Sequence, residues 1–406
     1  MSLNLYKKNI KHCYCGSSKF FKNIDFGNIP LNINNYNCKK KNDKKRVIIT
    51  ICKNCNLVQL RNSSNKKKLF PKNYSYHSGD SKEKIKNFKN ILDEIKKINP
   101  SFSLKIMDVG SNDNSFINLS KKKYYHTYGI EPTDAYKINN FYKCKIFGNF
   151  LNYNFAKKIN LKLDFIVACN ILGHTEDVSQ LLRGIKFLIK NNGYIIIEVQ
   201  YLILLFKNFG FDSFHHEHVN YFTLETLSKM LLKYGIFIKN AKILKVHGGI
   251  LRVIATTNQF SKTHLSINKI INSEKKINII QEIYNLNKFR LKFNININKL
   301  LNKIIKKKKI IYGIGAAPRA CALINSANIN KRQIKYIGEV ASSAKCGKYI
   351  PGTKISVINE NILLKKKPDY FFIFSWHLAC SLIRNYKKIG YKGKFIIPLP
   401  KIFIKN

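Results

Sequence analysis

The sequence predicts an α/β protein with two doubly wound domains behind a small cysteine-containing N-terminal domain. Apolar strand-like runs alternate with helix-like stretches from about residue 85 to 257 and again after about residue 305, a pattern typical of parallel sheets. Two close cysteine pairs lie in an N-terminal segment with little apolar periodicity. At 406 residues the chain is too long for one ordinary hydrophobic core.

We place the domain boundaries at 1–68, 69–257 and 258–406. The middle domain contains the strand-like runs LKIMDVG, YYHTYGIEP, LDFIVACN and YIIIEV. A lysine-rich, helix-like stretch from about 259 to 305 leads to a second series, KIIYGIGA, IKYIGEV, DYFFIFSW and GKFIIPLP. The last domain is therefore expected to consist of a helical linker followed by a Rossmann-like fold.

The formal charge of +51 favours an anionic partner at first sight. The lysines are, however, mixed with asparagine and isoleucine along the whole length, as in KKINIIQEIYNLNKF, and form no single basic segment. We interpret them mainly as a composition bias on solvated surfaces, with attraction of a phosphorylated substrate as a weaker interpretation. A zinc-ribbon protein that binds nucleic acid is the alternative class, and it predicts binding that falls steeply with salt.

Cysteine usage and apolar patterning indicate the compartment. Of ten cysteines, four fall in the two N-terminal pairs and the others are scattered, often beside apolar neighbours, as buried free thiols are. The most apolar runs are interrupted by charges well before a membrane-spanning length of about 18 residues. We expect a cytoplasmic monomer with reduced cysteines, no membrane partner and no specific nucleic-acid partner.

The N-terminal cysteines predict a structural zinc site. HCYCGSS carries Cys13 and Cys15, and ICKNCNLVQL carries Cys52 and Cys55 at the spacing typical of a zinc knuckle. Because Cys13 and Cys15 are only two apart, His12 could replace Cys13 as a ligand. A site with four protein ligands has no open position for water, so we expect the ion to stabilise the fold. Four unligated cysteines are the alternative.

LKIMDVGSNDNSF predicts a strand, a turn and the start of a helix, the arrangement of a cofactor site. Gly110 allows a ligand to approach the backbone, and we expect Ser111 and Asn112 to bind the cofactor with it. Asn114 is expected to adopt the positive φ that glycine usually supplies. Glu131 ends the next strand, where a carboxylate can bind ribose hydroxyls, although it could instead cap a helix. With one glycine and no second phosphate cradle, the pattern favours S-adenosylmethionine over a dinucleotide.

The run LDFIVACNILGHTED ends a strand at Asn170 and continues to His174. Ligands in open α/β sheets bind beyond the carboxyl ends of the strands, so both side chains are expected to face the cofactor crevice. We assign Asn170 to cofactor binding and His174 to the catalytic site. A surface or core histidine without a catalytic role is the alternative.

FHHEHVNYF places three histidines and a carboxylate close together at residues 214 to 222. On an extended segment, His216 and His218 lie on one face and Glu217 on the other. Their spacing differs from that of the zinc-binding helix motif, so we do not expect a second metal site. Catalysis by these groups and a hydrogen-bonded network that holds a loop remain the two hypotheses.

The chain resembles the sugar C-methyltransferases that act on nucleotide-linked keto-deoxysugars, over nearly its full length. The resemblance rests on CGSS, CKNCNLVQL, DVGSND with GIEP, FHHEHVNYF, HGGILRV and KYIPGTKI. It implies a zinc-binding N-terminal domain, a class I S-adenosylmethionine methyltransferase-like domain and a Rossmann-like C-terminal domain.

The resemblance also implies site residues. It places Tyr76 of SYHSGDS, His174, Glu217 and His218 on active-site positions of the family. The remaining substrate contacts that we expect are His215, Tyr221, His247 and Arg319. The chain departs from the family at His215 (tyrosine there), Asn114 and Ala320 (glycine), Arg319 (lysine) and Glu339 (aspartate). These departures bear on the identity of the substrate.

The histidines suit the removal of a proton from carbon, which C-methylation requires. An imidazole titrates near neutral pH, so we expect His218 to be the base and Glu217 to orient it. Tyr76, His174 and His216 are expected to bind the sugar and the enolate oxygen. Methyl transfer to oxygen or nitrogen of a related precursor is the alternative within the enzyme class.

The last domain repeats the strand, glycine turn and helix pattern in KIIYGIGAAPRACALIN. Family enzymes use this region to hold a nucleotide diphosphate, and Arg319 could bind one through two hydrogen bonds. A turn that is purely structural is the alternative. Trp376 and His377 follow a strand near the same edge.

Overall fold

The computed structural model describes residues 10–34, 36, 44–62, 66–123, 125–246, 248–341 and 343–406. The chain forms two compact units, each assembled from three segments. Unit 1 comprises residues 1–23, 50–203 and 218–279, and unit 2 comprises 24–49, 204–217 and 280–406. The α/β class is confirmed, since each unit contains a mostly parallel sheet with helices. The division into three domains stays a prediction.

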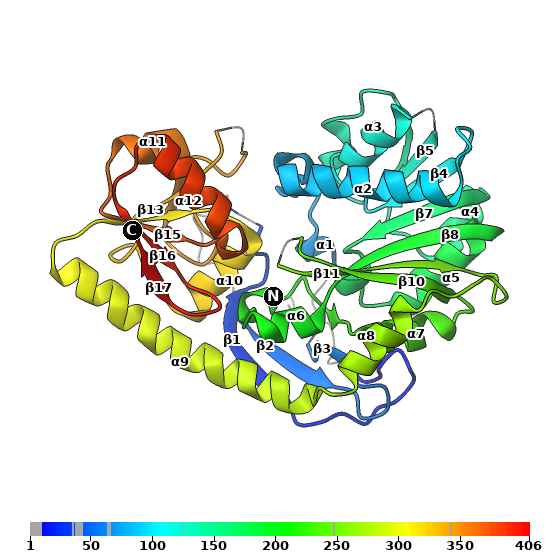
Figure 1. Ribbon diagram of the computed structural model, residues 1–406, viewed down its shortest axis with the longest axis horizontal. Coiled ribbons are helices and arrows are strands. Elements are labelled where there is room, and N and C mark those ends of the chain that lie inside the picture. The colour runs from blue at the N-terminus through cyan, green and yellow to red at the C-terminus, as the bar shows by residue number, and fades with distance from the viewer. Residues whose placement is uncertain are drawn as a thin grey trace, which may run out of the picture. The chain divides into compact units, whose positions relative to one another are not determined.

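Unit 1 contains a seven-stranded sheet in the order β10-β11-β8-β7-β4-β5-β6 (Figure 1). Its strands are β4 (Lys105–Val109), β5 (His126–Ile130), β6 (Lys145–Phe147), β7 (Leu163–Cys169), β8 (Ile189–Gln200), β10 (Phe237–Leu244) and β11 (Ile250–Thr256). Strands β4 to β8 are parallel, whereas β11 pairs antiparallel with both β8 and β10. The strand order reverses between β4 and β7, which creates a switch point where open α/β sheets bind ligands.

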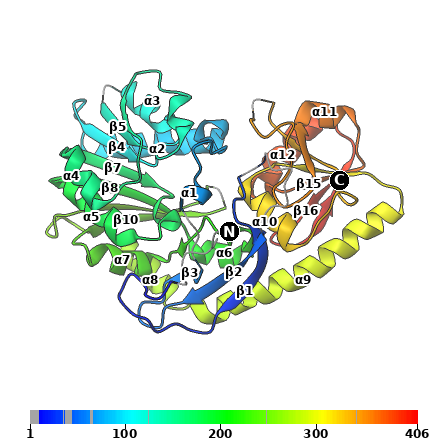
Figure 2. The same cartoon turned by 180° about the vertical axis from the view of Figure 1, so that it is seen from behind.

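The helices of unit 1 connect these strands. They are α1 (Lys66–Leu69), α2 (Lys82–Ile98), α3 (Ser115–Lys121), α4 (Tyr153–Ile159), α5 (Val178–Leu188), α7 (Leu224–Leu232) and α8 (Ser266–Glu274). Helix α6 (Leu202–Lys207) straddles the boundary of the two units. Seen from behind, α4 and α5 lie in front of the strands (Figure 2), and α2 lies on the opposite side, in front of the strands in Figure 1.

Helix α2 shows why this layer forms. The Ser81 hydroxyl caps the helix by accepting a hydrogen bond from the Lys84 amide, and Lys96 and Lys97 lie in the last turn, where the helix dipole favours cations. Phe88, Ile91, Leu92 and Ile95 recur at helical spacing and are buried against Ile106 of β4, Val167 of β7 and Ile196 of β8. The apolar half of the layer is thus one contiguous core.

The same layer becomes polar toward the carboxyl ends of the strands. Glu198 lies two residues after Ile196 and therefore on the same face of β8. Its buried carboxylate accepts hydrogen bonds from Arg252 Nε and Nη2 at 2.9 and 2.7 Å and from Asn87 Nδ2 at 2.9 Å. A buried charge is tolerated here because it is paired and hydrogen-bonded.

Unit 2 contains a six-stranded sheet in the order β14-β13-β12-β15-β16-β17. Its strands are β12 (Ile311–Ile314), β13 (Tyr336–Glu339), β14 (Ser356–Asn359), β15 (Tyr370–Ile373), β16 (Lys394–Ile397) and β17 (Phe403–Lys405). All are parallel except β17, and the order reverses between β12 and β15. This is the second doubly wound sheet that the sequence predicted.

The helices of unit 2 include one long amphipathic element. They are α9 (Ile279–Lys306), α10 (Pro318–Ser326), α11 (Glu360–Lys365) and α12 (Ala379–Lys388). Helices α8 and α9 account for the predicted lysine-rich helical stretch, and the buried side of α9 carries Ile283, Leu286 and Phe293. None of the helices in the described residues has the length and apolar character needed to cross a membrane.

Short antiparallel pairs complete the two units. In unit 2, β1 (Ile24–Pro30) pairs with β2 (Lys44–Ile51). In unit 1, β3 (Val58–Leu60) pairs with β9 (Asn220–Tyr221). The pairing of β3 with β9 brings the end of the histidine-rich motif onto the segment after the second cysteine pair.

The Glu198 network generates a stability prediction. Replacement of Arg252 by methionine removes the guanidinium and leaves a buried carboxylate with only Asn87 as a donor. We expect the free energy of unfolding to fall by about 3–5 kcal/mol, measured by urea titration. The matched control is Lys190→Met, which breaks the more exposed pair with Asp164 and should cost at most about 1 kcal/mol. Equal losses in the two variants would contradict the prediction.

Candidate functional site

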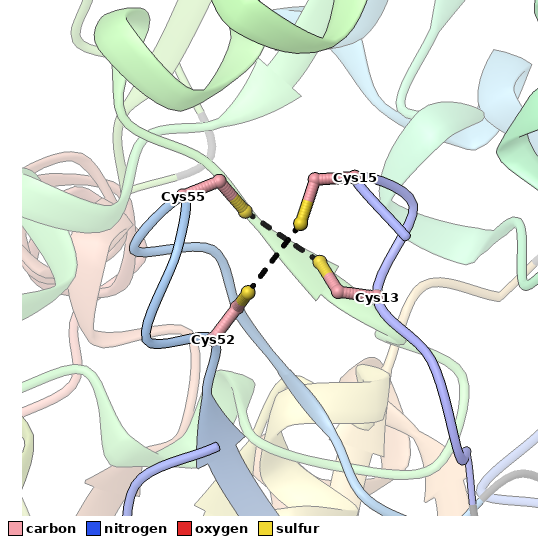
Figure 3. Close-up of side chains that lie close together, drawn as sticks. All are labelled: Cys13, Cys15, Cys52 and Cys55. Carbon is pink, nitrogen blue, oxygen red and sulfur yellow. Dashed lines mark hydrogen bonds between the residues drawn. The ribbon is translucent and has the colours of Figure 1, made fainter. Parts of the chain in front are cut away.

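Four cysteine sulfurs converge at the N-terminal end of unit 1 (Figure 3). Cys13 Sγ lies 3.5 Å from Cys55 Sγ, and Cys15 Sγ lies 3.6 Å from Cys52 Sγ. All four sulfurs lie within 4.8 Å of one another. Four thiolates at about 2.3 Å from one zinc ion are about 3.8 Å apart in a tetrahedron, so the cluster is compatible with zinc.

Two tight turns position these sulfurs. Gly16 has φ 93° in the first turn and Asn56 has φ 60° in the second, and both turns are closed by backbone hydrogen bonds to cysteine carbonyls. His12 is exposed, whereas Cys13 lies within the cluster, so the structure selects Cys13 over His12 as the fourth ligand. The neighbouring Cys55 side chain and burial raise the pKa of Cys13, as expected where clustered thiolates need a cation.

The turn after β4 has the conformation that the sequence predicted. Gly110 has φ 77°, and Asn114 has φ 61°, which confirms that Asn114 adopts the positive φ typical of glycine. The Gly110 and Ser111 amides both donate to the Ile130 carbonyl at the end of β5. A Cβ on Gly110 would lie 2.1 Å from Ile171 Cδ1, which would have to shift, and the positive φ favours glycine where the ends of β4 and β7 meet.

Glu131 lies directly after β5 and is 5% exposed. One carboxylate oxygen accepts from the Asn112 amide at 2.8 Å. The other accepts from the Thr133 amide and hydroxyl at 2.9 and 2.6 Å. These contacts fix the carboxylate beside the Gly110 turn, and the oxygen that accepts only from the Asn112 amide keeps a lone pair for a further donor such as a ribose hydroxyl.

The loop that carries Tyr76 is hydrogen-bonded to the same turn. Asn112 Nδ2 donates to the Tyr76 carbonyl at 2.9 Å, and Asn112 Oδ1 accepts from the Ser78 amide at 2.8 Å. The Gly79 amide donates to Asp113 Oδ2 at 2.8 Å. These hydrogen bonds hold together segments that are 34 to 36 residues apart in the sequence.

His174 and His218 lie side by side at the neighbouring strand end. His174 closes the 3₁₀ turn Leu172–His174 after β7, and its ring centroid is 4.8 Å from that of His218. The segment is held by the Val219 amide, which donates to the Gly173 carbonyl at 2.7 Å. Both imidazoles are only partly buried, so they remain accessible to a ligand. Asn170 is also partly buried. It has φ 60° and lies in the turn between β7 and the 3₁₀ turn of His174.

Residues 215 to 218 are not an extended segment. His216 and Glu217 form a turn, because a 3₁₀ helix (Phe211–Ser213) precedes them and β9 begins at Asn220. His216 and His218 therefore do not share one face of a strand. Glu217 ends a segment of unit 2, whereas His218 begins a segment of unit 1.

Residues 215 to 217 of the motif are buried in unit 2. His216 Nε2 lies 3.1 Å from the Lys45 carbonyl, and Glu217 accepts from Asn34 Nδ2 at 2.9 and 3.1 Å. His215 and His216 are each 1% exposed, and burial lowers the pKa of His216 to about 4. Because the His216 imidazole is buried and neutral, it is better suited to packing than to proton transfer.

The other predicted substrate residues are distributed over both units. Tyr221 is buried in β9 opposite Val58, and His247 lies outside the described residues. Arg319 lies in the first turn of α10 and forms two hydrogen bonds to Asp212, at 3.1 and 2.6 Å. Trp376 Nε1 donates to the same carboxylate at 2.9 Å. Asp212 thus links two residues that follow β12 and β15 at the switch point of unit 2.

Sequence reasoning missed four polar residues that the fold buries beside these sites: Asn34, Lys84, Asp108 and Asp212. Two of them carried a signal. Lys84 falls on the apolar face of α2 by its spacing to Phe88 and Ile91, and Asp108 interrupts a buried strand. Asn34 and Asp212 carried none, because their partners are distant in sequence.

Two family matches agree with this architecture. Residues 63–237 match a family described as "Methyltransferase domain", and residues 245–400 match one described as "C-methyltransferase C-terminal domain". The first range contains the Gly110 turn and both neighbouring imidazoles, and the second contains the six-stranded sheet up to β16.

A curated relative has a similar length. The chain is 23% identical over 399 residues to C-methyltransferase NovU of Streptomyces niveus, which covers 95% of this chain and 94% of that protein. Among solved structures, the chain is similar to a magnesium protoporphyrin IX methyltransferase of Synechocystis PCC 6803 with bound SAH. The identity is 13%, the match covers 43% of this chain and 82% of that chain, and the TM-score is 0.34. A Pyrococcus horikoshii OT3 protein, PH0226, matches at 14% identity. The match covers 47% of this chain and 97% of that chain, with a TM-score of 0.36.

The switch point of the seven-stranded sheet and the two family matches define a methyltransferase that uses S-adenosylmethionine. Within that class, residues 245–400 match the C-methyltransferase C-terminal domain, and the chain is similar to a C-methyltransferase over 95% of its length. The buried carboxylate of Glu131 and the fixed turn beside it fit the adenosyl end of this cofactor, and the Cys₄ cluster fits a structural zinc ion.

The cysteine cluster predicts bound zinc. The purified protein should contain about one zinc ion per chain by elemental analysis, and a chelator should lower its thermal midpoint because the ion stabilises the N-terminal turns. Cys55→Ser should lose the metal. Cys380→Ser, at an exposed cysteine outside the cluster, is the control and should keep it. Metal loss in neither variant would rule out the site.

His216 predicts a pH dependence of stability. Because burial lowers its folded-state pKa to about 4, the unfolded chain binds this proton more tightly, and stability is lost as pH falls below about 6.5. The contribution of His216 between about pH 7 and pH 5 is about 2 kcal/mol. Urea titrations at both pH values should show a smaller decrease in His216→Gln than in the unsubstituted protein. The exposed control His126→Gln should show the full decrease.

Proposed function

We propose that the protein transfers a methyl group to a carbon next to the ketone of a nucleotide-linked deoxysugar, through an enolate. The observation that carries this proposal is the pair of partly buried imidazoles, His174 and His218, beside the strand end that meets the Gly110 turn. The sugar substrate is supported by the resemblance of FHHEHVNYF and HGGILRV to the deoxysugar C-methyltransferases.

His218 is the proposed base. A hydrogen next to a ketone is removable when a group with a pKa near neutral lies close to it, and imidazole is such a group. Among the three histidines and the glutamate of the motif, His215, His216 and Glu217 are buried in unit 2, and His218 is the one that remains partly accessible. The edge-to-face contact with His174 restrains the ring, so His218 needs little reorganisation to reach the proton.

Tyr76 and His174 are the proposed donors to the enolate oxygen. The Tyr76 backbone is held beside the Gly110 turn by Asn112, and His174 is held by its 3₁₀ turn and by an edge contact with Phe70, at 5.7 Å between ring centroids. Donors that are fixed before the reaction stabilise developing negative charge by about 10² to 10³ in rate each. Glu217 has a positioning role in this proposal, because its bonds to Asn34 fix the turn that precedes His218.

The cofactor and the sugar nucleotide would be held by different parts of the chain. When bound, S-adenosylmethionine supplies a methyl group that a carbon nucleophile can attack. Glu131, with Asn112, is positioned to bind the ribose hydroxyls. Arg319 is the proposed diphosphate ligand, and its paired hydrogen bonds to Asp212 would have to open for that contact.

Deuterium exchange tests the base directly. The protein is incubated in D₂O with a panel of nucleotide-linked 4-keto sugars, and incorporation beside the ketone is followed by mass spectrometry. His218→Ala should lower both exchange and methyl transfer by about 10² to 10⁴. His126→Ala, at an exposed histidine at the start of β5, should leave both rates unchanged.

Two results would contradict the proposal. Exchange that persists in His218→Ala would remove His218 from the role of base. Recovery of the labelled methyl group on oxygen or nitrogen of the acceptor, instead of carbon, would overturn the enolate route.

A further inference from the structure

The turn that carries His174 is short and needs support from outside itself. It is the 3₁₀ helix Leu172–His174, and the His174 ring centroid lies 4.8 Å from that of His218. A 3₁₀ turn has poorer hydrogen-bond geometry than an α-helix. Its closing bond, from the Thr175 amide to the Leu172 carbonyl, is 3.3 Å long. The spacing of the two imidazoles therefore depends on what holds this turn.

Three carbonyls at this turn accept hydrogen bonds from two consecutive residues, Val219 and Asn220. The Val219 amide donates to the Gly173 carbonyl at 2.7 Å. Asn220 Nδ2 donates to the Leu172 carbonyl at 3.3 Å and to the Thr175 carbonyl at 2.8 Å. One side-chain amide thus spans the turn from its first residue to the residue after its last. Both donors directly follow His218 in the chain.

Asn220 is itself fixed by the strand pair to which it belongs. It is 7% exposed, and in β9 it lies opposite Gln59 of β3. The Leu60 amide of β3 also donates to the Val219 carbonyl at 2.9 Å. A carboxamide nitrogen carries two hydrogens, and here each has an acceptor, so the side chain has a defined orientation before any ligand binds. All of these residues belong to unit 1.

We infer that Asn220 is a positioning residue that sets the orientation of His174 relative to His218. The inference rests on the proposed function, in which His218 removes the proton and His174 donates to the enolate oxygen. Asn220 acts through the backbone of the turn and not by contact with the reacting atoms. The motif FHHEHVNYF therefore supplies one imidazole and also the side chain that holds the turn of the other. A misplacement of about 1 Å can cost about 10²-fold in rate.

The test compares proton removal with cofactor binding in Asn220→Ala. Deuterium incorporation beside the ketone of nucleotide-linked 4-keto sugars is measured in D₂O at saturating sugar, and the dissociation constant of S-adenosylhomocysteine is measured by calorimetry. We expect incorporation to fall by about 10- to 100-fold and the dissociation constant to change by less than about twofold. The two results separate because both acceptors of Asn220 lie at the turn after β7. A general loss of fold would weaken both.

Amide hydrogen exchange of the protein reports on the turn without any substrate. Mass spectrometry should show faster exchange of the amides of residues 172–175 in Asn220→Ala. The matched control is Asn152→Ala, which removes the N-cap of α4, where the Asn152 side chain accepts from the Phe155 amide at 2.9 Å. This variant should also lose stability, yet the protection of residues 172–175 and the deuterium incorporation into the sugar should not change.

The outcomes distinguish this role from the proposed function. If Asn220→Ala does not fold, Asn220→Ser takes its place, since the shorter side chain cannot bridge both carbonyls. Unchanged protection of residues 172–175, or full incorporation into the sugar despite faster exchange of the turn, would overturn the role of Asn220. No incorporation by the unsubstituted protein would instead overturn the proposed function.

Discussion

The reversal of strand order between β4 and β7 is the constraint on which the site depends. Where two parallel neighbours lead to connections on opposite sides of the sheet, their carboxyl ends leave room for a ligand. In this protein the turn after β4 carries Gly110 and the turn after β7 carries Ile171, and the two turns are in van der Waals contact. The Gly110 turn and the turn that leads to His174 are therefore neighbours because of topology, although Gly110 and His174 are 64 positions apart in the sequence.

One structural layer contains both an apolar core and a polar end. The face of β4, β7 and β8 that packs under α2 is apolar at Ile106, Val167 and Ile196, and two residues further on it becomes polar. Strand periodicity makes this change abrupt, because the next side chain on a face is about 7 Å away along the strand. The same helix therefore contributes Phe88 and Ile91 to the core and Lys84 to the polar end.

The histidine-rich motif is divided by a single turn. Glu217 is anchored by Asn34 in unit 2, while the chain continues at His218 into unit 1, where Val219 is hydrogen-bonded to Gly173. Closely spaced titratable groups need not share one site, since a turn can direct successive side chains into different surroundings. The burial of His216 and the accessibility of His218 follow from that turn and not from their residue type.

The sequence by itself determined the α/β class, the two doubly wound sheets, the convergence of four cysteines and the positive φ of Asn114, because strand periodicity, close thiol spacing and turn chemistry are local properties. It also indicated His174 and His218, since both follow recognisable motifs. Only the tertiary structure decided that His12 lies outside the cysteine cluster, that Glu217 faces Asn34 and that Arg319 faces Asp212. Those contacts join residues 100 or more positions apart, and no local pattern specifies which of many polar side chains a folded chain will bring together.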